Sequence, residues 1–303
     1  MSLAKAKKQL TLQEFINRHT AKMPHLEVIW ESYVNDYGLL WGIFAYPNAI
    51  FKRGIGKSVL AIKLLLGVYR DWDTAKKYIF YSPTEFVRVF KELVDHHKRI
   101  PLAIWDDAGA WLFRGRYKSK FVMAVVEHLE VIRTHVSTMI FTATSYGKLA
   151  KGIRESLSLV DLVSVENVKP RRDIPECRRL IEANRGKTYR ELAEAHEKCF
   201  VKISKTRGYI VDSEDFEWLF YRRKMPEPLW EYRFMAVLPD EIYLDYKRMR
   251  DKYVEAGTKK IQKELEELAE KAAEELEEIA ESDDKEAVEE LELEDIAREW
   301  GYI

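Results

Sequence analysis

The stretch Asn48-Ala49-Ile50-Phe51-Lys52-Arg53-Gly54-Ile55-Gly56-Lys57-Ser58 decides how the rest of the chain is interpreted. Its last three residues match the end of the pattern G-x-x-x-x-G-K-[ST], which is typical of loops that bind nucleotide phosphates. Phe51 stands where the first glycine of that pattern belongs. Gly54 and Gly56 still allow the backbone to turn so that N–H groups point at an anion. The stretch therefore predicts a phosphate-binding loop with one departure from the pattern, and a chance match in an ordinary loop is the alternative.

The same pattern predicts a role for each residue of the loop. A helix from Ser58 to about Arg70 would direct its N-terminal dipole at the bound anion. Lys57 would reach the terminal phosphates as a catalytic residue, and the Ser58 hydroxyl would hold Mg²⁺. We expect ATP to contact Arg53, Gly54, Ile55, Gly56, Lys57, Ser58 and Val59.

A second signal follows an apolar run further along the chain. The run Leu102-Ala103-Ile104-Trp105 reads as a buried strand, and it ends in Asp106 and Asp107. Asp106 would hold the Mg²⁺ shell, and Asp107 would orient or deprotonate an attacking water. A strand that ends in a plain polar turn is the alternative. It loses weight because a helix, a strand and another helix separate the loop from this pair.

Two further residues are candidates for catalysis. The next strand ends in Thr144, whose hydroxyl would sense the γ-phosphate or position water, with Ser145 as second choice. Hydroxyl residues that simply fill a strand are the alternative. Arg154 would act as an arginine finger on the nucleotide of a neighbouring subunit, with Arg133 as a rival. A solvated surface arginine is the alternative for both.

A basic loop between residues 113 and 121 is the candidate DNA contact. Cations neutralise backbone phosphates, and aromatic rings stack on bases, so their alternation suits a nucleic-acid surface. A solvated basic loop is the alternative. The predicted DNA-binding residues are Arg114, Arg116, Lys118 and Lys120, interleaved with Phe113, Tyr117 and Phe121.

The charge of the chain is divided unevenly. The 303 residues carry a net charge of −1, but residues 255–303 hold 19 acidic and 6 basic side chains. That segment therefore carries −13, and residues 1–254 carry +12. A basic body suits a polyanionic partner such as DNA, and the acidic tail suits a protein partner or serves only solubility.

The cysteines and the hydrophobic runs bear on the compartment. Cys177 and Cys199 lie far apart in the sequence and show no metal-ligand spacing, which favours reduced thiols in a cytoplasmic protein. The longest apolar run, Leu39 to Phe51, is too short to span a membrane. We therefore expect no membrane association.

The order of elements predicts an α/β fold, with a P-loop NTPase parallel sheet flanked by helices, followed by an accessory region and a charged helical tail. A strand is expected to end near Ile50, followed by strands at 77–81, 102–105, 138–144 and 160–165. Residues 200–204 and 209–211 read as a hairpin or as part of a winged helix. The predicted divisions are an N-terminal helical segment (1–44), the ATPase core (45–168), the accessory region (169–254) and the acidic helical tail (255–303).

The order of these motifs resembles the DnaC/IstB-like helicase-loader branch of the AAA+ ATPases. The resemblance covers about residues 45–165 and is carried by residues 46–63, 78–82 and Ile104-Trp105-Asp106-Asp107-Ala108-Gly109. It implies ATP at Lys57 and Ser58, Mg²⁺ at Asp106 and catalysis at Asp107. Phe51 and Thr144-Ser145 depart from that branch, which has a glycine and an asparagine there. Residues 52–54, 133–135 and 151–154 also resemble FtsK/HerA-type and phage packaging ATPases.

Two functions follow as hypotheses. The first is an oligomeric ATPase that acts on DNA, either as a helicase loader or as a translocating motor. The second is a nucleotide switch or DNA-binding adaptor that does not hydrolyse ATP. In this hypothesis Phe51 prevents turnover, and the acidic tail recruits a partner. A small-molecule kinase is the third hypothesis and the weakest, because no sequence pattern for a second substrate pocket is recognisable.

Overall fold

The protein is described by a computed structural model, which covers residues 11–20, 23–47, 49, 51–116, 120–129, 131–166, 168–184, 186–187, 192–193, 195–202, 205–222, 224–255 and 258–259. The chain divides into two compact units, residues 1–246 and 247–303. In the second unit the described residues 247–255 and 258–259 are helical. The predicted tail helices lie almost wholly outside the described residues.

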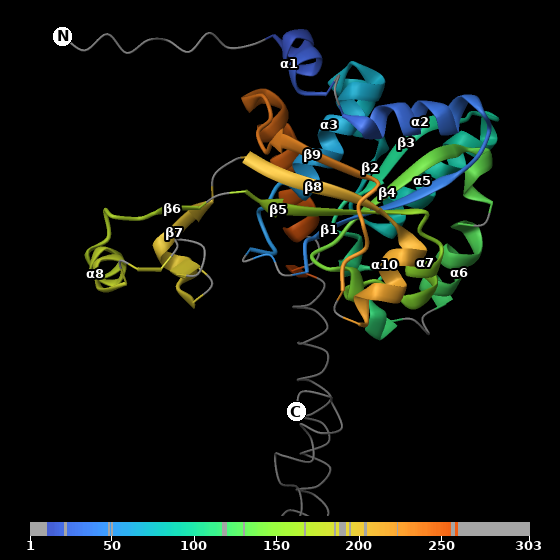
Figure 1. Cartoon of the computed structure of the whole chain (residues 1–303). Helices are drawn as coiled ribbons and strands as arrows, with labels where there is room; N and C mark the ends of the chain where they lie inside the picture. The colour runs from blue at the N-terminus through green and yellow to red at the C-terminus, as the bar shows by residue number, and fades with distance from the viewer. Residues whose placement is uncertain are drawn as a thin grey trace, which may run out of the picture. The chain divides into compact units, whose positions relative to one another are not determined.

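A seven-stranded sheet forms the centre of the first unit (Figure 1). Its strand order is β2-β3-β4-β1-β5-β8-β9, in which the first five strands are parallel and the last two run antiparallel to their neighbours. The strands are β1 (Leu39–Ala45), β2 (Ile79–Phe80), β3 (Ile100–Trp105), β4 (Val136–Thr142), β5 (Leu159–Val165), β8 (Lys205–Asp212) and β9 (Trp230–Met235). This arrangement confirms the predicted α/β fold class with a mostly parallel sheet.

Helices flank this sheet (Figure 1). They are α1 (Leu12–His19), α2 (Pro24–Val34), α3 (Lys57–Tyr69), α4 (Trp72–Ala75), α5 (Pro83–Asp95), α6 (Lys120–Leu129), α7 (Lys151–Glu155) and α10 (Ser213–Phe220). Residues 240–246 at the end of the first unit are also helical. Strands β1, β3 and β4 are buried along almost their whole length because helices cover the sheet.

The strand before the phosphate loop lies earlier than the sequence suggested. It was expected to end near Ile50, but β1 ends at Ala45 and occupies the middle of the sheet between β4 and β5. The end of the strand could not be located within the apolar run Leu39 to Phe51. Phe51 is apolar because it is buried in the loop, not because it belongs to the strand. The sheet therefore begins six residues before the predicted start of the core at residue 45.

The N-terminal helix α2 packs against the sheet through a buried polar cluster. His25 Nε2 lies 2.7 Å from Asp161 Oδ2 on β5, and the Tyr232 hydroxyl on β9 donates a hydrogen bond to the same oxygen. Burial, and then the charge of Asp161, raise the pKa of Tyr232 well above its usual value. Buried polar groups are costly unless paired, so this cluster fixes α2, β5 and β9 in one arrangement.

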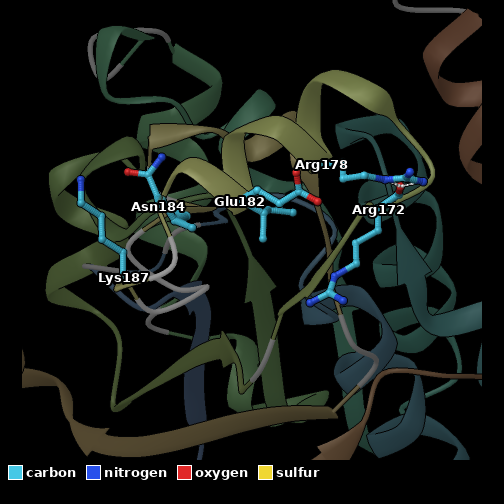
Figure 2. Close-up of a pocket in the computed structure, with 7 residues that line it drawn as sticks. Arg172, Arg178, Glu182, Asn184 and Lys187 are labelled. Carbon is cyan, nitrogen blue, oxygen red and sulfur yellow. Dashed lines mark hydrogen bonds between the residues drawn. The ribbon is translucent and has the colours of Figure 1, made fainter.

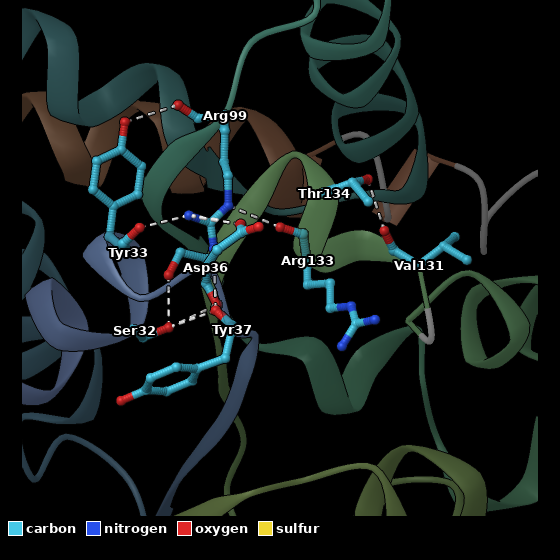
Figure 3. Close-up of polar contacts among 9 residues, drawn as sticks. Ser32, Tyr33, Asp36, Tyr37, Arg99, Val131, Arg133 and Thr134 are labelled. Atoms are coloured by element: carbon cyan, nitrogen blue, oxygen red, sulfur yellow. Dashed lines mark hydrogen bonds and ion pairs between the residues drawn. The ribbon is translucent and has the colours of Figure 1, made fainter.

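Arg99, the residue before β3, joins the end of α2 to carbonyls outside that helix (Figure 3). Its guanidinium donates to the carbonyls of Tyr33 at 2.7 Å, Tyr37 at 3.1 Å and Arg133 at 3.0 Å. The carbonyl of Tyr33 lies in the last turn of α2, where helix carbonyls have no partner within the helix. One planar side chain therefore satisfies three carbonyls from two distant segments.

The accessory region is built differently from the expected hairpin. Strand β7 (Phe200–Lys202) pairs with β6 (Val168–Pro170), whereas β8 pairs with β5 and β9. Residues 200–204 and 209–211 are close in sequence, which suggested a hairpin, but each strand finds a partner elsewhere. Helix α8 (Pro175–Ala183) and the 3₁₀ turn η6 (Glu197–Cys199) lie in the same connection.

The prediction that the two cysteines are reduced thiols is wrong for this structure. Cys177 on α8 and Cys199 on η6 form a disulfide, with their Cα atoms 5.1 Å apart. Their sequence separation of 22 gave no spacing signal, and only the return of the chain from α8 to β7 brings them together. The argument for a cytoplasmic protein rested partly on free thiols and loses that support. Within the described part of the chain, no helix combines the length and the apolar character needed to cross a bilayer.

Candidate active site

The phosphate loop connects β1 to α3 and ends in a glycine with a left-handed backbone. Gly56 caps α3 at φ 97°, and Gly54 has φ 61°. Residues other than glycine rarely adopt such backbone angles. A methyl group at Gly56 would also lie 2.7 Å from the Cβ atom of Ala236. The strand–glycine loop–helix arrangement is that of a P-loop NTPase-like fold, and it aims the N-terminus of α3 at the loop.

Phe51 and Lys57, which stand at the first-glycine and the lysine positions of the phosphate-loop pattern, are both buried. Phe51, at the position of the missing glycine, is only 4% exposed. Lys57 is 7% exposed, and its Nζ atom donates a hydrogen bond of 2.9 Å to the carbonyl of Lys52. Arg53 and Gly54 are exposed, and Val59 is half-buried. The lysine side chain therefore lies back across its own loop, with its ammonium beside the loop carbonyls.

Asp106 is the centre of the site, because three hydroxyl groups donate hydrogen bonds to its carboxylate. Ser58 Oγ donates to Oδ1 at 2.8 Å, and Thr142 Oγ1 donates to the same oxygen at 2.6 Å. The Tyr246 hydroxyl donates to the other oxygen, Oδ2, at 2.8 Å. The structure thus brings together the predicted pair Ser58 and Asp106, from α3 and from the end of β3.

Burial strongly affects the ionisation of Asp106. Loss of solvent, and then the nearby Asp107 carboxylate, raise the pKa of Asp106, while the bonds from Thr142, Ser58 and Tyr246 act in the opposite direction. Each hydroxyl donor favours the ionised form of the carboxylate. The donors therefore help to keep a negative charge in a buried place.

Asp107 has a strained backbone next to this carboxylate. Its φ of 51° and ψ of 36° are left-handed, which few residues other than glycine adopt. The Asp107 N–H donates to Thr142 Oγ1 at 2.9 Å, so Thr142 contacts both acids. Backbone strain of this kind costs about 1–3 kcal/mol and clusters at functional sites. It turns the chain at the end of β3 and fits the predicted role of Asp107 near reacting groups.

Two residues of the site were missed from the sequence. The prediction chose Thr144 at the end of the fourth strand, but the hydroxyl that contacts Asp106 belongs to Thr142, the last residue of β4. Strands β3 and β4 are parallel, with Trp105 opposite Phe141. The residues that follow them, Asp106 and Thr142, therefore lie level with one another. No local signal could have found Tyr246, which lies 140 residues from Asp106 in sequence.

Arg154 occupies a different environment from the one predicted. It is 5% exposed, its Nη1 atom donates to the Tyr221 hydroxyl, and it lies 3.5 Å from a carboxylate oxygen of Glu217. Its guanidinium also lies 5.1 Å from the centre of the Tyr146 ring. Within one chain the guanidinium of Arg154 contacts Tyr221 and Glu217, and its role as a finger on a neighbouring subunit stays a prediction. Its rival Arg133 is exposed, in the 3₁₀ turn η4 (Ile132–Thr134).

The predicted DNA-binding loop is only partly described. Arg114 lies in the 3₁₀ turn η3 (Arg114–Arg116), and its side chain is exposed, as is that of Lys120 at the start of α6. Lys118 and the side chain of Arg116 lie outside the described residues. The DNA contact therefore stays a prediction for all four residues.

The donor set of the site suits a hard cation. No group of three or more His, Cys, Asp or Glu side chains gathers as a metal site within the described residues. Instead the Ser58 hydroxyl and the Asp106 carboxylate lie in hydrogen-bond contact beside the loop. Mg²⁺ is usually bound by one or two protein oxygens together with water and substrate phosphates, so these residues fit it.

Comparisons with known proteins give similarity over part of the chain. One relative is the uncharacterized protein B-251 of Sulfolobus spindle-shape virus 1, which is 30% identical over 112 residues. Another is the uncharacterized protein ORF286 of Acidianus two-tailed virus, which is 28% identical over 102 residues. The alignments span 34% and 33% of this chain but only 45% and 36% of those proteins, less than half of either. No protein-family model matches the chain.

One solved structure also shows similarity. It is the genome packaging NTPase B204 from Sulfolobus turreted icosahedral virus 2, in complex with ATP-gammaS. The match covers 67% of this chain and 100% of that one, with 10% sequence identity and a TM-score of 0.32. Similarity at this level carries no argument about function.

Proposed function

We propose that this protein is a Mg²⁺-dependent P-loop ATPase that acts on DNA as an oligomer. One observation carries the ATPase part of the proposal. Ser58 at the N-terminus of α3 and Asp106 at the end of β3 are joined by a hydrogen bond of 2.8 Å, directly beside a loop with left-handed glycines. A phosphate cradle and a metal-binding carboxylate in contact form the two halves of a nucleoside triphosphatase site.

Each residue of the site has its own proposed role. Loop N–H groups and Lys57 bind the phosphates, and Lys57 exchanges its bond to the Lys52 carbonyl for a phosphate oxygen. Ser58 and Asp106 hold Mg²⁺, which neutralises charge on the phosphates when bound. Asp107 orients the attacking water and accepts its proton, and Thr142 fixes Asp107 through its backbone N–H.

The DNA part of the proposal rests on charge. Residues 1–254 carry a net charge of +12, and the exposed cations Arg114 and Lys120 flank the segment that follows β3. Coupling between this segment and Asp106-Asp107 would link phosphate chemistry to DNA contact. Such a motor works as an oligomer, because neighbouring subunits complete one another's sites, with Arg154 and its rival Arg133 as the candidate arginine fingers.

ATP turnover with and without single- and double-stranded DNA tests this proposal. We expect DNA to stimulate hydrolysis, and Asp107→Asn to lower turnover by more than a hundredfold while ATP binding persists. Asp95→Asn, at an exposed position at the end of α5, is the matched control and should leave turnover unchanged. Sizing with a non-hydrolysable analogue tests the oligomer. Turnover that Asp107→Asn leaves intact would rule out the assigned water-activating residue.

A second function has a specific observation in its favour. The buried Phe51 replaces the first loop glycine, and Lys57 is bonded to the loop itself. A loop held in this way would bind nucleotide without turning it over, and the protein would then be a switch or an adaptor. ATP binding without hydrolysis under every DNA condition is the result that would favour this alternative.

A further inference from the structure

The connection between β5 and β8 forms a small cross-linked module, which we call the disulfide module (residues 168–202). Strands β6 and β7 pair with each other, and the Cys177–Cys199 disulfide joins α8 to η6. A few buried side chains complete it, namely Cys177, Ile181, Leu192, Ala193, Cys199 and Phe200. With only these buried side chains among its described residues, the module depends on its disulfide as a staple.

A cavity of 440 Å³ opens on this module and carries an excess of positive charge (Figure 2). Its lining contains three cations, Arg172, Arg178 and Lys187, against a single carboxylate, Glu182. In Figure 2, Lys187 and Asn184 lie at one end of the lining and the two arginines at the other. Ile181 and Leu192 also line the cavity. A concave site of this charge concentrates anions.

The donors in the cavity are partly oriented in advance. Arg178 Nε and Nη2 both donate to the carbonyl of Arg172, at 3.2 and 3.1 Å, which fixes the plane of the guanidinium. Arg178 Nη1 and Lys187 Nζ have no partner within the described part of the chain. Asn184 donates to the Leu180 carbonyl at 2.9 Å, which orients its amide. A fixed guanidinium and an ammonium at opposite ends of one cavity suit an anion with several oxygens.

We infer that this cavity binds a phosphate group. Two sources have the same chemistry: the backbone of a nucleic acid, and a free phosphate or small phosphate compound. The nucleic-acid source rests on the proposed function, because a DNA-dependent ATPase needs contacts to the DNA backbone away from its nucleotide site. Phosphate binding by itself does not depend on that function. The module was not among the predicted DNA-binding residues, which lie at positions 114–120.

The test compares the full chain with the double variant Arg178→Gln/Lys187→Gln. Inorganic phosphate binding is followed by calorimetry, and binding of a labelled DNA duplex by fluorescence anisotropy at several salt concentrations. The double variant should lose phosphate binding, bind DNA roughly tenfold more weakly and lower the salt slope by about 2. Arg88→Gln/Lys91→Gln removes two exposed cations from α5 and is the matched control. Thiol titration checks that each variant keeps its disulfide.

The outcomes separate the sources. Loss of phosphate binding with DNA binding equal to the control would assign the cavity to a small phosphate compound. If the double variant matches the control for both ligands, the inference is overturned. ATP turnover is measured on the same samples, so a protein without ATPase activity would refute the proposed function and leave the phosphate result standing.

A different observation carries a second inference, which concerns Tyr246. This residue is 5% exposed, and its hydroxyl bond to Asp106 Oδ2 comes from a segment that follows β9 and crosses the phosphate loop. The segment is anchored both before its helical part and within it. The Met235 carbonyl accepts a hydrogen bond from Lys63, and Asp245 accepts one of 2.8 Å from Trp72 Nε1. Ala236 packs against Gly56 itself.

We infer that Tyr246 is a positioning residue for the metal-binding carboxylate. Each carboxylate oxygen has two lone pairs, and Ser58 and Thr142 already occupy both on Oδ1. The Tyr246 bond occupies one on Oδ2, fixes the plane of the carboxylate and leaves one lone pair for the metal or its water. This inference rests on the proposed function, because it assigns Tyr246 to the same Mg²⁺ site.

The test measures metal binding rather than activity alone. Mn²⁺ binding to the full-length protein, with and without ADP, is followed by electron paramagnetic resonance. Tyr246→Phe should raise the Mn²⁺ concentration at half-saturation roughly tenfold, as expected for loss of one bond to a charged group. Tyr243→Phe, at a 48% exposed position of the same helical segment, is the control. An unchanged or lower half-saturation concentration would overturn the inference. Absence of any ADP binding would refute the proposed function separately, while the metal titration without nucleotide still tests Tyr246.

Discussion

Lys63 is the most unusual residue of the apolar helix α3, because its side chain is fully buried. Its Nζ atom donates to the Met235 carbonyl and lies 5.3 Å from the centre of the Phe15 ring. Burial lowers the pKa of Lys63 to about 8 from an ordinary value of 10.5. Below pH 8 the folded protein must keep a charged ammonium in this place, which reduces stability.

The lowered pKa predicts how stability changes with pH. Between about pH 8 and 10.5 the unfolded chain binds a proton at Lys63 that the folded protein lacks, so stability rises with pH in this window. Relative to Lys63→Met, the free energy of unfolding of the wild type should rise by at most about 3 kcal/mol across it. Denaturant titrations at pH 7 to 10.5 measure this, with the exposed Lys91→Met as control. Parallel curves for wild type and Lys63→Met would contradict the prediction.

Phe51 is the second residue whose role the structure changes. Phe51 stands where the loop pattern has a glycine, but its ring is 4% exposed and belongs to the core. Removing a buried phenylalanine costs about 3–5 kcal/mol through lost burial and a cavity. We therefore expect Phe51→Gly to be clearly destabilised in denaturant titrations, whatever it does to turnover. Phe51→Leu keeps most of the volume and should lose less than about 1.5 kcal/mol. If both variants are as stable as the wild type, Phe51 has no packing role.

The candidate site shows which residues a sequence can reveal. Lys57, Ser58, Asp106 and Asp107 were found because each stands beside a glycine turn or at the end of an apolar run. The contact between Ser58 and Asp106, 48 residues apart, followed from the fold class, since carboxyl ends of parallel strands meet at one edge. Tyr246 reaches the same carboxylate only because β9 and its following segment return over the loop. Nothing in the local sequence marks that return.

At the scale of elements, the strands buried on both faces were predictable and the additions to the sheet were not. Strands β3, β4 and β5 lie within two residues of their predicted ends, because continuous apolar runs mark such strands. The pairing of β8 with β5 could not be predicted, since a strand's partner depends on long-range packing. The predicted hairpin failed for that reason: residues 200–202 pair with residues of β6 that lie 30 to 34 positions earlier in the chain.

The disulfide module provides the prediction that belongs to this scale. Its bond closes a loop across 22 residues, which stabilises by about 3 kcal/mol in the chain-entropy description. The pair Cys177→Ser/Cys199→Ser should therefore open the module while the sheet stays folded. Hydrogen exchange of residues 171–199 should accelerate at least tenfold, and exchange in β3 and β4 should not change. Equal acceleration in the sheet would mean that the module is part of the main cooperative unit.

At the scale of the whole molecule, charge divides the chain in a way that the fold does not explain. Residues 1–254 carry +12 and residues 255–303 carry −13, so nearly equal and opposite charges are joined in one chain. The acidic segment lies almost entirely outside the described residues, and its predicted helices remain predictions. We expect its charge to weaken the binding of a polyanion to the body, because a tethered acidic segment would compete for the same cations.

This competition gives the prediction for the full chain. Replacing ten acidic residues of the tail by their amides, within residues 264–281 and 283–290, removes most of the excess charge without shortening the protein. The variant should bind duplex DNA several-fold more tightly at low salt, and the gain should shrink as salt screens the tail. Replacing acids on the body instead, at the exposed Glu92 and Asp95, is a smaller control that should change affinity little. If amide substitution in the tail leaves DNA affinity unchanged at every salt concentration, the tail does not compete with DNA, and recruitment of a protein partner becomes the better explanation of its charge.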